Sequence, residues 1–393
     1  MTYAAPFAGI RVVDLTQGLA GPEAGMLLAQ YGADVIKVEP LGGDWSRNQG
    51  QKFGDFTDKT IANNRGKRSI ALDLKSDAGK GVLRQLVEKA DVFLEAFRPG
   101  VIQRLGFGYD TVITYNPGII YLSVSGFSQI GPLSERPATD AVLQAYSGLM
   151  QVNKGSVDGL PHRVGIWPID MISGLYAFQA ISTALYAKRE EPKGRFIDCS
   201  LMQSAAAIQA IRVIEYSVAG GEGLASQSFV GTFRTQDGWI NLSVMDDKAW
   251  AKLCAAIERP DLLTDPRFAV RIDRYDNDVQ AKELVQSVLE TRSFEAWSVR
   301  LTDAGVLHER VNDYLDFLAH PHTSASNAVQ WTDHPDIGRI PIPNIPGVEP
   351  AVDGEARSRA PRLGEHTREV LADLGLAAQE IAELLQAGVV GGN

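Results

Sequence analysis

Short runs of β-branched and apolar residues alternate with amphipathic stretches through the first 200 residues of the chain. A strand, a helix and a second strand of these lengths form a parallel crossover, which predicts one doubly wound parallel sheet. The pattern predicts strands over Ile10–Leu15, Asp34–Glu39, Ser69–Leu74, Val92–Glu95 and Ile119–Ser125, with helices over Glu23–Gln30 and Ala78–Lys89.

The longest apolar stretch follows Pro168. From Asp170 to Lys188 the residues are apolar on most faces, which is typical of a buried helix. A strand-like run, Phe196–Leu201, comes next. The composition then changes at residues 218–228, where AGGEGLASQS predicts a flexible link.

A smaller α+β region begins after this link with a hairpin over Phe233–Val244, and three amphipathic helices continue it. A stretch rich in Pro and Gly from His320 to Pro361 predicts an extended return connection, and two helices follow it, over Glu365–Leu374 and Ala378–Gln386. The expected domains are a large α/β domain (1–217), a linker (218–228), a small α+β domain (229–319) and a return segment completing the large domain (320–393).

Composition and charge restrict the function classes. Of the 393 residues, 45% are hydrophobic and 22% charged, which is typical of a globular protein. The net charge of −10 disfavours nucleic acids and anionic membranes as partners. Cys199 and Cys254 form no paired framework, and neither a leader pattern nor a run long enough to span a membrane is visible. We expect a soluble, cytoplasmic protein.

A glycine-containing turn follows the first predicted strand. Gly18, Gly21 and Gly25, with Glu39 at the end of the next strand, resemble the dinucleotide-binding fingerprint, in which an acidic residue holds the ribose. The glycines here fall as GxxGxxxG, and Pro22 removes one N–H group that could face a phosphate. Taken alone, the residues favour a tight strand-to-helix turn.

A basic segment extends from Arg47 to Arg104, with 12 Lys and Arg against 7 Asp and Glu, a local net charge of +5. The segment could bind an anionic ligand carrying phosphates, or it could be an ordinary solvated surface. The cations at predicted loops or element ends are Arg65, Lys67, Arg68, Lys75, Arg98 and Arg104.

Asp170 opens the predicted buried helix two residues after Pro168. The simplest interpretation is an N-cap. A carboxylate beside the free N–H groups of a helix terminus also suits a nucleophile whose attack on a carbonyl develops an oxyanion. No metal-binding pattern competes with it, because His320 and His322 flank a proline without a carboxylate cluster or an HExxH helix. We therefore expect no metal.

Nine strings, in order along almost the whole chain, resemble the class III CoA-transferase family, the carnitine and bile-acid-inducible type that includes formyl-CoA transferase. They are GIRVVDLTQGLAGP, GADVIKVEPLGGDWSR, NRGKRSIALDLKS, ADVFLEAFRPGVIQRLGFGYD, YLSVSGF, DAVLQAYSGLM, PIDMISGLYA, ALYAKRE with IDCSL, and RAPRLGEHTREVLADLG.

The resemblance implies a Rossmann-like large domain that binds coenzyme A, an interlocked homodimer, and CoA transfer from an acyl-CoA thioester to a free carboxylic acid. The family's catalytic aspartate falls on Asp170, which would carry an aspartyl-CoA thioester, and Asp140 matches an acidic position close to it. The resemblance places the CoA site at Ala20, Gly21, Leu72, Lys75, Phe97, Arg98 and Arg104.

Two departures and three alternatives accompany this resemblance. Ala96 replaces the Asn that often precedes the FRPG string, and only Gly220, Gly221 and Gly223 resemble the glycine lid of formyl-CoA transferase. An acyl-CoA racemase of the same superfamily is one alternative, although Thr139 stands where racemases have a histidine. A nicotinamide-dependent oxidoreductase and a non-catalytic CoA- or nucleotide-binding protein are the others.

Overall fold

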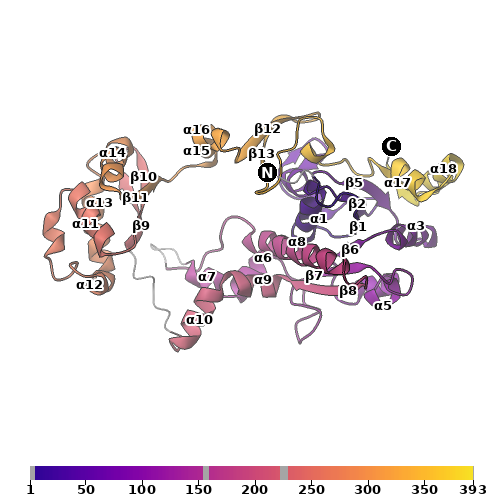
Figure 1. Ribbon diagram of the computed structural model, residues 1–393, viewed down its shortest axis with the longest axis horizontal. Helices are drawn as coiled ribbons and strands as arrows, with labels where there is room; N and C mark the ends of the chain where they lie inside the picture. Colours follow the sequence, from indigo (N-terminus) through magenta and orange to yellow (C-terminus); the bar gives the residue numbers. More distant parts are fainter. Residues whose placement is uncertain (1–4, 154–158, 222–228, 393) are drawn as a thin grey trace. The chain divides into compact units, whose positions relative to one another are not determined.

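The structure is a computed structural model that describes residues 5–153, 159–221 and 229–392. The chain divides into two compact units (Figure 1). The larger unit combines Met1–Ala210 with Ser326–Asn393, and the smaller unit is Ile211–Ala325. The larger unit is therefore built from two segments that are distant in the sequence.

A seven-stranded sheet forms the centre of the larger unit, in the order β14-β5-β2-β1-β6-β7-β8. Six strands are parallel and only β14 is antiparallel to its neighbour. The strands are β1 (Arg11–Asp14), β2 (Asp34–Glu39), β5 (Arg68–Leu72), β6 (Val92–Glu95), β7 (Ile120–Ser125), β8 (Arg195–Ser200) and β14 (Val390–Gly391).

The strand order positions the functional site. Counted along the chain, the parallel strands are arranged 3-2-1-4-5-6, the order of the doubly wound dinucleotide-binding fold. The winding direction reverses between β1 and β6, and open α/β sheets bind ligands in the crevice at the carboxyl ends of the strands at this point. The predicted mixed α/β fold with a mostly parallel sheet is confirmed.

Two hydrophobic cores cover the two faces of this sheet, because successive strand residues point to opposite sides: Val12 belongs to one core and Val13 to the other. The Val12 core contains α1 (Ala20–Gln30), α8 (Pro168–Lys188) and α9 (Leu201–Ile208). The Val13 core contains α3 (Asp77–Glu88), α4 (Val101–Leu105), α17 (Thr367–Leu374) and α18 (Ala378–Gln386).

The larger unit also contains several shorter elements. They are the 3-10 helix η1 (Trp45–Asn48), the hairpin β3 (Lys52–Phe53) and β4 (Phe56–Thr57), and the helices α2 (Asp58–Asn63), α5 (Tyr109–Val112), α6 (Asp140–Tyr146) and α7 (Leu149–Val152).

The return segment contains regular structure that the sequence analysis missed. Where an extended connection was expected, β12 (Val329–His334) and β13 (Gly338–Pro343) pair as an antiparallel ribbon. A short 3-10 helix, η3 (Ala356–Ser358), follows them. Pro341 and Pro343 lie within β13, where a two-stranded ribbon has free edges that tolerate a residue without an N–H group.

The smaller unit is an α+β fold around the buried Trp250 and Trp297. Its antiparallel sheet has the order β11-β10-β9, with β9 (Phe229–Thr235), β10 (Gly238–Val244) and β11 (Leu307–Arg310). Its helices are α10 (Ala210–Val218), α11 (Asp247–Ala256), η2 (Pro260–Leu263), α12 (Arg271–Asp276), α13 (Asp278–Leu289), α14 (Phe294–Ala304), α15 (Tyr314–Ala319) and α16 (Pro321–Ala325). Within the described ranges, no helix combines the length and apolar character needed to cross a bilayer.

Candidate active site

A pocket of about 530 Å³ opens at the carboxyl edge of the sheet, where the winding direction reverses. Its wall includes segments that follow β1, β6 and β7, together with the beginning of α8. The residues are Gln17, Leu19, Ala20, Gly21, Trp45, Ala96, Phe97, Arg98, Pro99, Val124, Ser125, Gly126, Ser134, Arg136, Pro137, Ala138, Thr139, Asp170 and Leu201.

Asp170 is the third residue of α8 and lies half-buried in this wall. The interpretation of Asp170 as the N-cap is wrong, because the cap position is Trp167 and Pro168 fills the first helical position. No hydrogen bond to the Asp170 carboxylate is formed by the residues that the structure describes. Its oxygens are therefore available to a ligand in the pocket.

Asp140 performs the capping instead, from the first turn of α6. Its Oδ2 accepts hydrogen bonds from the backbone N–H groups of Ile169 (2.7 Å) and Asp170 (3.1 Å). Its Oδ1 accepts one from the Gln144 amide at 2.5 Å. The buried Asp140 carboxylate thus satisfies two otherwise free donors at the beginning of α8 and fixes the backbone of Asp170.

The electrostatic environment of Asp170 makes its charged form costly. Burial, and then the nearby Asp140 carboxylate, raise the pKa of Asp170 to about 7. No cation offsets this effect within hydrogen-bonding distance in the described part of the chain. Both protonation states of Asp170 are therefore populated near neutral pH, and the ionised state is a stronger base and nucleophile than an ordinary surface carboxylate.

The turn between β1 and α1 is held by a buried ion pair. Lys37 Nζ lies 3.2 Å from Asp44 Oδ2 and also donates to the Thr16 carbonyl. Both Asp44 oxygens accept from the Gly18 N–H at 3.1 Å. Trp45 packs against Gly18 so closely that a Cβ there would lie 2.3 Å from the indole. The pair and the indole together fix one wall of the pocket.

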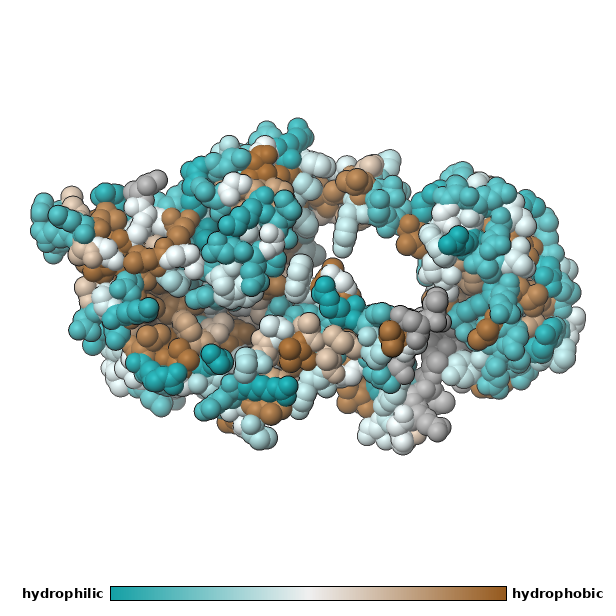
Figure 2. Space-filling view, turned by 180° about the vertical axis from the view of Figure 1, so that it is seen from behind, coloured by the Kyte–Doolittle hydropathy of each residue, from teal (hydrophilic) through white to brown (hydrophobic). Residues whose placement is uncertain are grey.

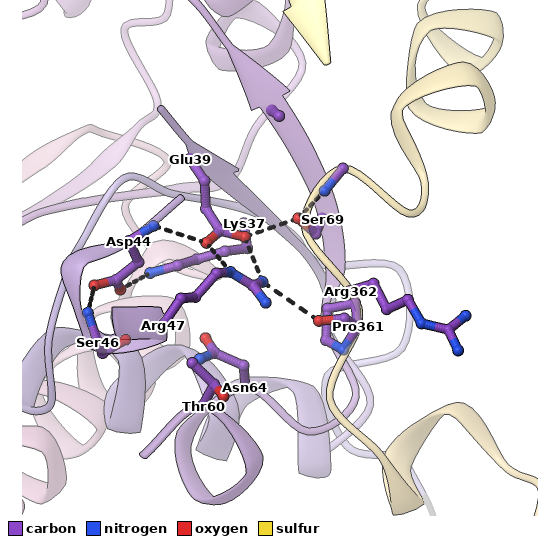
Figure 3. A network of polar contacts seen from close by, with 12 residues as sticks. Lys37, Glu39, Asp44, Ser46, Arg47, Thr60, Asn64, Ser69, Pro361 and Arg362 are labelled. Carbon is purple, nitrogen blue, oxygen red and sulfur yellow. Dashed lines mark hydrogen bonds and ion pairs between the residues drawn. The ribbon is translucent and has the colours of Figure 1, made fainter. Parts of the chain in front are cut away.

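Glu39 is fully engaged in internal contacts, which removes the ribose-binding role that the glycine pattern suggested. Its Oε1 and Oε2 accept from Arg47 Nε and Nη2, both at 2.7 Å. Ser69 Oγ donates to Oε2 at 2.8 Å, and the Asp44 N–H donates to Oε1 at 3.1 Å. Figure 3 shows these donors converging on Glu39 from β5 and from the segment after β2. Glu39 is thus not available to hold the ribose of a nicotinamide cofactor, which removes the main support for an oxidoreductase.

Part of the basic segment forms ion pairs inside the protein. Lys67 is buried and donates to Asp14 Oδ2 at 2.9 Å, Pro22 O at 2.8 Å and Asn64 Oδ1 at 3.0 Å. Arg68 pairs with Asp34 at 2.7 Å and with two carboxylates of α17, and Arg65 is also buried. Lys67 and Arg68 therefore do not face an anionic ligand, whereas Arg65 lines a second pocket. The Asp14 and Asp34 carboxylates compensate the cost of burying Lys67 and Arg68.

The structure brings together part of the set expected from the resemblance. Ala20, Gly21, Phe97 and Arg98 line the pocket with Asp170. The other members lie near the ends of β5 and β6 but outside the lining: Leu72 is buried, while Lys75 and Arg104 are exposed. Arg98, Lys75 and Arg104 form no ion pair with any residue in the described ranges. These three side chains at this edge of the sheet are thus available to bind an anionic ligand.

Several lining residues were missed by the sequence analysis, including Gln17, Trp45, Ser125 and Arg136. Ser125 could have been found from the rule that ligands bind at the carboxyl ends of parallel strands, since it ends β7. Arg136 lies in a loop whose sequence gives no such signal. Gly220 and Gly221 follow α10, and Gly223 lies outside the described residues.

The described residues contain no group of three or more His, Cys, Asp or Glu side chains arranged to hold a metal ion. Thr139, at the cap position of α6, contributes a hydroxyl group rather than an imidazole to the pocket. The reactive side chain that the geometry offers is the Asp170 carboxylate.

Comparison with known proteins shows one family. A family model described as CoA-transferase family III matches residues 7–367. The human succinyl-CoA:glutarate CoA-transferase is 34% identical over 395 residues, which cover 98% of this chain and 90% of the relative. The Acetobacter aceti acetyl-CoA:oxalate CoA-transferase is 35% identical over 369 residues, covering 92% of this chain and 93% of the relative.

Solved structures agree with the sequence comparisons. The crystal structure of a CAIB/BAIF family protein from Brucella suis has a TM-score of 0.83 and 30% sequence identity to this chain. The match covers 94% of this chain and 100% of that structure.

Proposed function

From the premise that this chain belongs to CoA-transferase family III and is an enzyme that transfers CoA, we propose that Asp170 is its nucleophile and carries CoA as a covalent thioester. CoA moves from an acyl-CoA donor to a free carboxylic acid. The large unit binds the coenzyme, and the small unit lies between its two segments in the sequence.

The proposal is supported by the different contacts of Asp140 and Asp170. Asp140 caps α8, so the Asp170 carboxylate is free of hydrogen bonds to the described residues and lines the pocket. A carboxylate that only stabilised its helix would accept N–H donors from the first turn. Asp170 does not, and its pKa is raised to about 7 by burial and by Asp140.

The proposed reaction is a sequence of acyl exchanges. The ionised Asp170 attacks the thioester carbonyl of the donor, the C–S bond breaks, and a mixed anhydride and a CoA thiolate form. The thiolate attacks the Asp170 carbonyl carbon of the anhydride, which releases the donor acid as a carboxylate and leaves aspartyl-CoA. The acceptor carboxylate repeats both steps in reverse, so the new acyl-CoA departs and Asp170 is regenerated. Protons and electrons balance without a further reactant.

The exposed cations at the same edge of the sheet support the proposed coenzyme site. Arg98 lies in the pocket, and Lys75 and Arg104 follow β5 and β6. Phosphates of CoA would bind these groups, while Ala20 and Gly21 at the beginning of α1 let the ligand approach the backbone closely.

We also propose a cytoplasmic homodimer. Large apolar side chains are exposed on α8 and α10 of the single chain, among them Leu175, Tyr176, Tyr186, Ile211 and Ile214. Figure 2 shows brown patches of apolar residues on the visible face of the larger unit. Exposed apolar surface on this scale is typical of interfaces. Light scattering coupled to size exclusion should give about twice the chain mass of 42.6 kDa.

The printed names of relatives suggest which substrates to test. Relatives transfer CoA between succinyl-CoA and glutarate, and between acetyl-CoA and oxalate. Short dicarboxylic acids and their CoA thioesters are therefore the proposed substrates. Proton exchange at the α-carbon of a 2-methylacyl-CoA is not expected, because Thr139 cannot act as a base near neutral pH.

The experiment that tests the nucleophile is chemical trapping. The protein is incubated with succinyl-CoA or acetyl-CoA, treated with hydroxylamine or borohydride, and digested for mass spectrometry. Modification is expected on the peptide containing Asp170, and none in Asp170→Asn. Full CoA exchange by Asp170→Asn, or trapping at another side chain, contradicts the proposal.

A further inference from the structure

Arg136 occupies a fixed place on the wall of the pocket that contains Asp170. Its backbone N–H donates to the Leu133 carbonyl at 2.9 Å, which closes a turn. Two residues later, Ala138 packs against Gly126 so tightly that a Cβ at Gly126 would lie 2.4 Å from it. Asp140, which holds the backbone of Asp170, follows directly. The loop carrying Arg136 is therefore connected to the reactive residue through well-defined contacts.

The guanidinium of Arg136 has a cation–π contact but no anionic partner. Its Cζ lies 5.7 Å from the ring centroid of Phe127, which is buried in the sheet's core. None of the described residues forms an ion pair or a side-chain hydrogen bond with it. Its donors are thus unused, while the aromatic contact restricts where they point.

The charges that line the pocket are unbalanced. The charged residues in its lining are Arg98, Arg136 and Asp170. On the proposed function, Arg98 faces a phosphate of CoA and Asp170 reacts, which leaves one cation without a role. A planar guanidinium binds a carboxylate through two parallel hydrogen bonds, and it discriminates strongly against a ligand that lacks this group.

We propose that Arg136 binds the second, unreacted carboxylate of a dicarboxylic substrate and so selects diacids over monoacids of equal length. The inference rests on the proposed function, because the first carboxylate of the same molecule is the one that exchanges with Asp170. Arg136 is a specificity residue, and it takes no part in forming or breaking bonds.

The test compares matched acids as acceptors, with acetyl-CoA as the donor, because its acyl group carries no second carboxylate. The pairs are succinate with butyrate, glutarate with valerate, and adipate with hexanoate. For at least one pair the wild type should prefer the diacid, and Arg136→Gln should lower kcat/KM for that diacid by about 10- to 100-fold, the usual range for losing a charged hydrogen bond. The value for the matched monoacid should change less than about twofold. Arg136→Lys keeps the positive charge but loses the two parallel N–H donors of the guanidinium. Its kcat/KM for the diacid should therefore lie between the values of the wild type and of Arg136→Gln.

Three outcomes overturn the proposal: no preference of the wild type for a diacid in any pair, an equal loss for diacid and monoacid in Arg136→Gln, or a rise in KM for the acyl-CoA donor alone. The last outcome assigns Arg136 to a CoA phosphate. Asp170→Asn separates this result from the proposed function. If the wild type exchanges CoA and Asp170→Asn does not, the proposed role of Asp170 is supported independently of the results for Arg136.

Discussion

The Oδ2 atom of Asp140 lies 3.1 Å from the backbone nitrogen of Asp170, so one acidic residue holds another by its main chain and leaves the second side chain free. The same contact places two like charges close together. Burial and this neighbour raise the pKa of Asp170 to about 7. Asp140 thus fixes the backbone of Asp170 by hydrogen bonding and raises the pKa of its side chain by charge repulsion.

The first prediction concerns the pH dependence of turnover. On the proposed function Asp170 must be ionised to attack the thioester, so kcat/KM should fall below about pH 7, approaching tenfold per pH unit in the more acidic range. Asp140→Asn keeps an oxygen that can accept from the helix N–H groups but removes the charge, so the midpoint should move to lower pH. Initial rates measured across the pH range check this. A midpoint unchanged in Asp140→Asn contradicts the electrostatic coupling.

The second prediction concerns stability. The pKa of Asp170 is about 7 in the folded protein against 3.8 for an ordinary Asp side chain, so between these pH values the folded state retains a proton that the unfolded chain has lost. The wild type therefore loses stability relative to Asp170→Asn as pH rises from about 4 to about 7. Urea unfolding at about pH 5 and about pH 8 measures the change. The prediction is contradicted if Asp170→Asn exceeds the wild type in unfolding free energy by more at about pH 5 than at about pH 8.

The third prediction separates a buried ion pair from a surface pair. Glu39→Ala leaves the Arg47 guanidinium buried without its carboxylate and should lower the free energy of unfolding by about 3–5 kcal/mol. The control is Glu88→Ala, which removes the exposed partner of Arg84 and should cost less than about 1 kcal/mol. Denaturant unfolding of both variants gives the comparison. Similar small losses of unfolding free energy in both variants would show that the Glu39–Arg47 pair adds little to stability.

The fourth prediction addresses the coenzyme site. Arg98→Gln should raise KM for the acyl-CoA donor by about tenfold or more, through the loss of a charged hydrogen bond to phosphate. Higher salt should weaken donor binding in the wild type more than in the variant, because salt screens the exposed charge. Arg189→Gln is the control, since Arg189 is also exposed but lies at the carboxyl end of α8, outside the residues that line the pocket. Equal changes of the donor KM in the two variants would contradict the proposed contact of Arg98 with a CoA phosphate.

Local sequence signals predicted much of the sheet. The runs DVIKVE and VFLE are rich in β-branched and apolar residues, and their observed bounds, Asp34–Glu39 and Val92–Glu95, agree with the prediction. The helix Ala378–Gln386 also agrees. Such elements are determined by their own residues and by burial on a periodic face, so their pattern is visible without the fold.

Contacts between distant segments could not be predicted in the same way. Nothing near Asp170 in the sequence shows that Asp140, in another helix, caps α8. Gly21 was assigned to a turn but lies inside α1, where a Cβ would come within 2.3 Å of Thr16. Lys67 looked solvent-exposed because its partner Asp14 is 53 residues away. Each error concerns a residue whose environment is made by the fold.

The pairing of β14 with β5 has a consequence for biosynthesis. Residues 390–391 form a sheet edge with a strand made more than three hundred residues earlier, after the whole inserted unit has been synthesised. Until those residues leave the ribosome, the backbone of β5 lacks its last neighbour, and open strand edges promote association with other chains. We therefore expect recombinant yield to depend strongly on the integrity of this C-terminal strand, and a nascent chain stalled before it to be a target for chaperones.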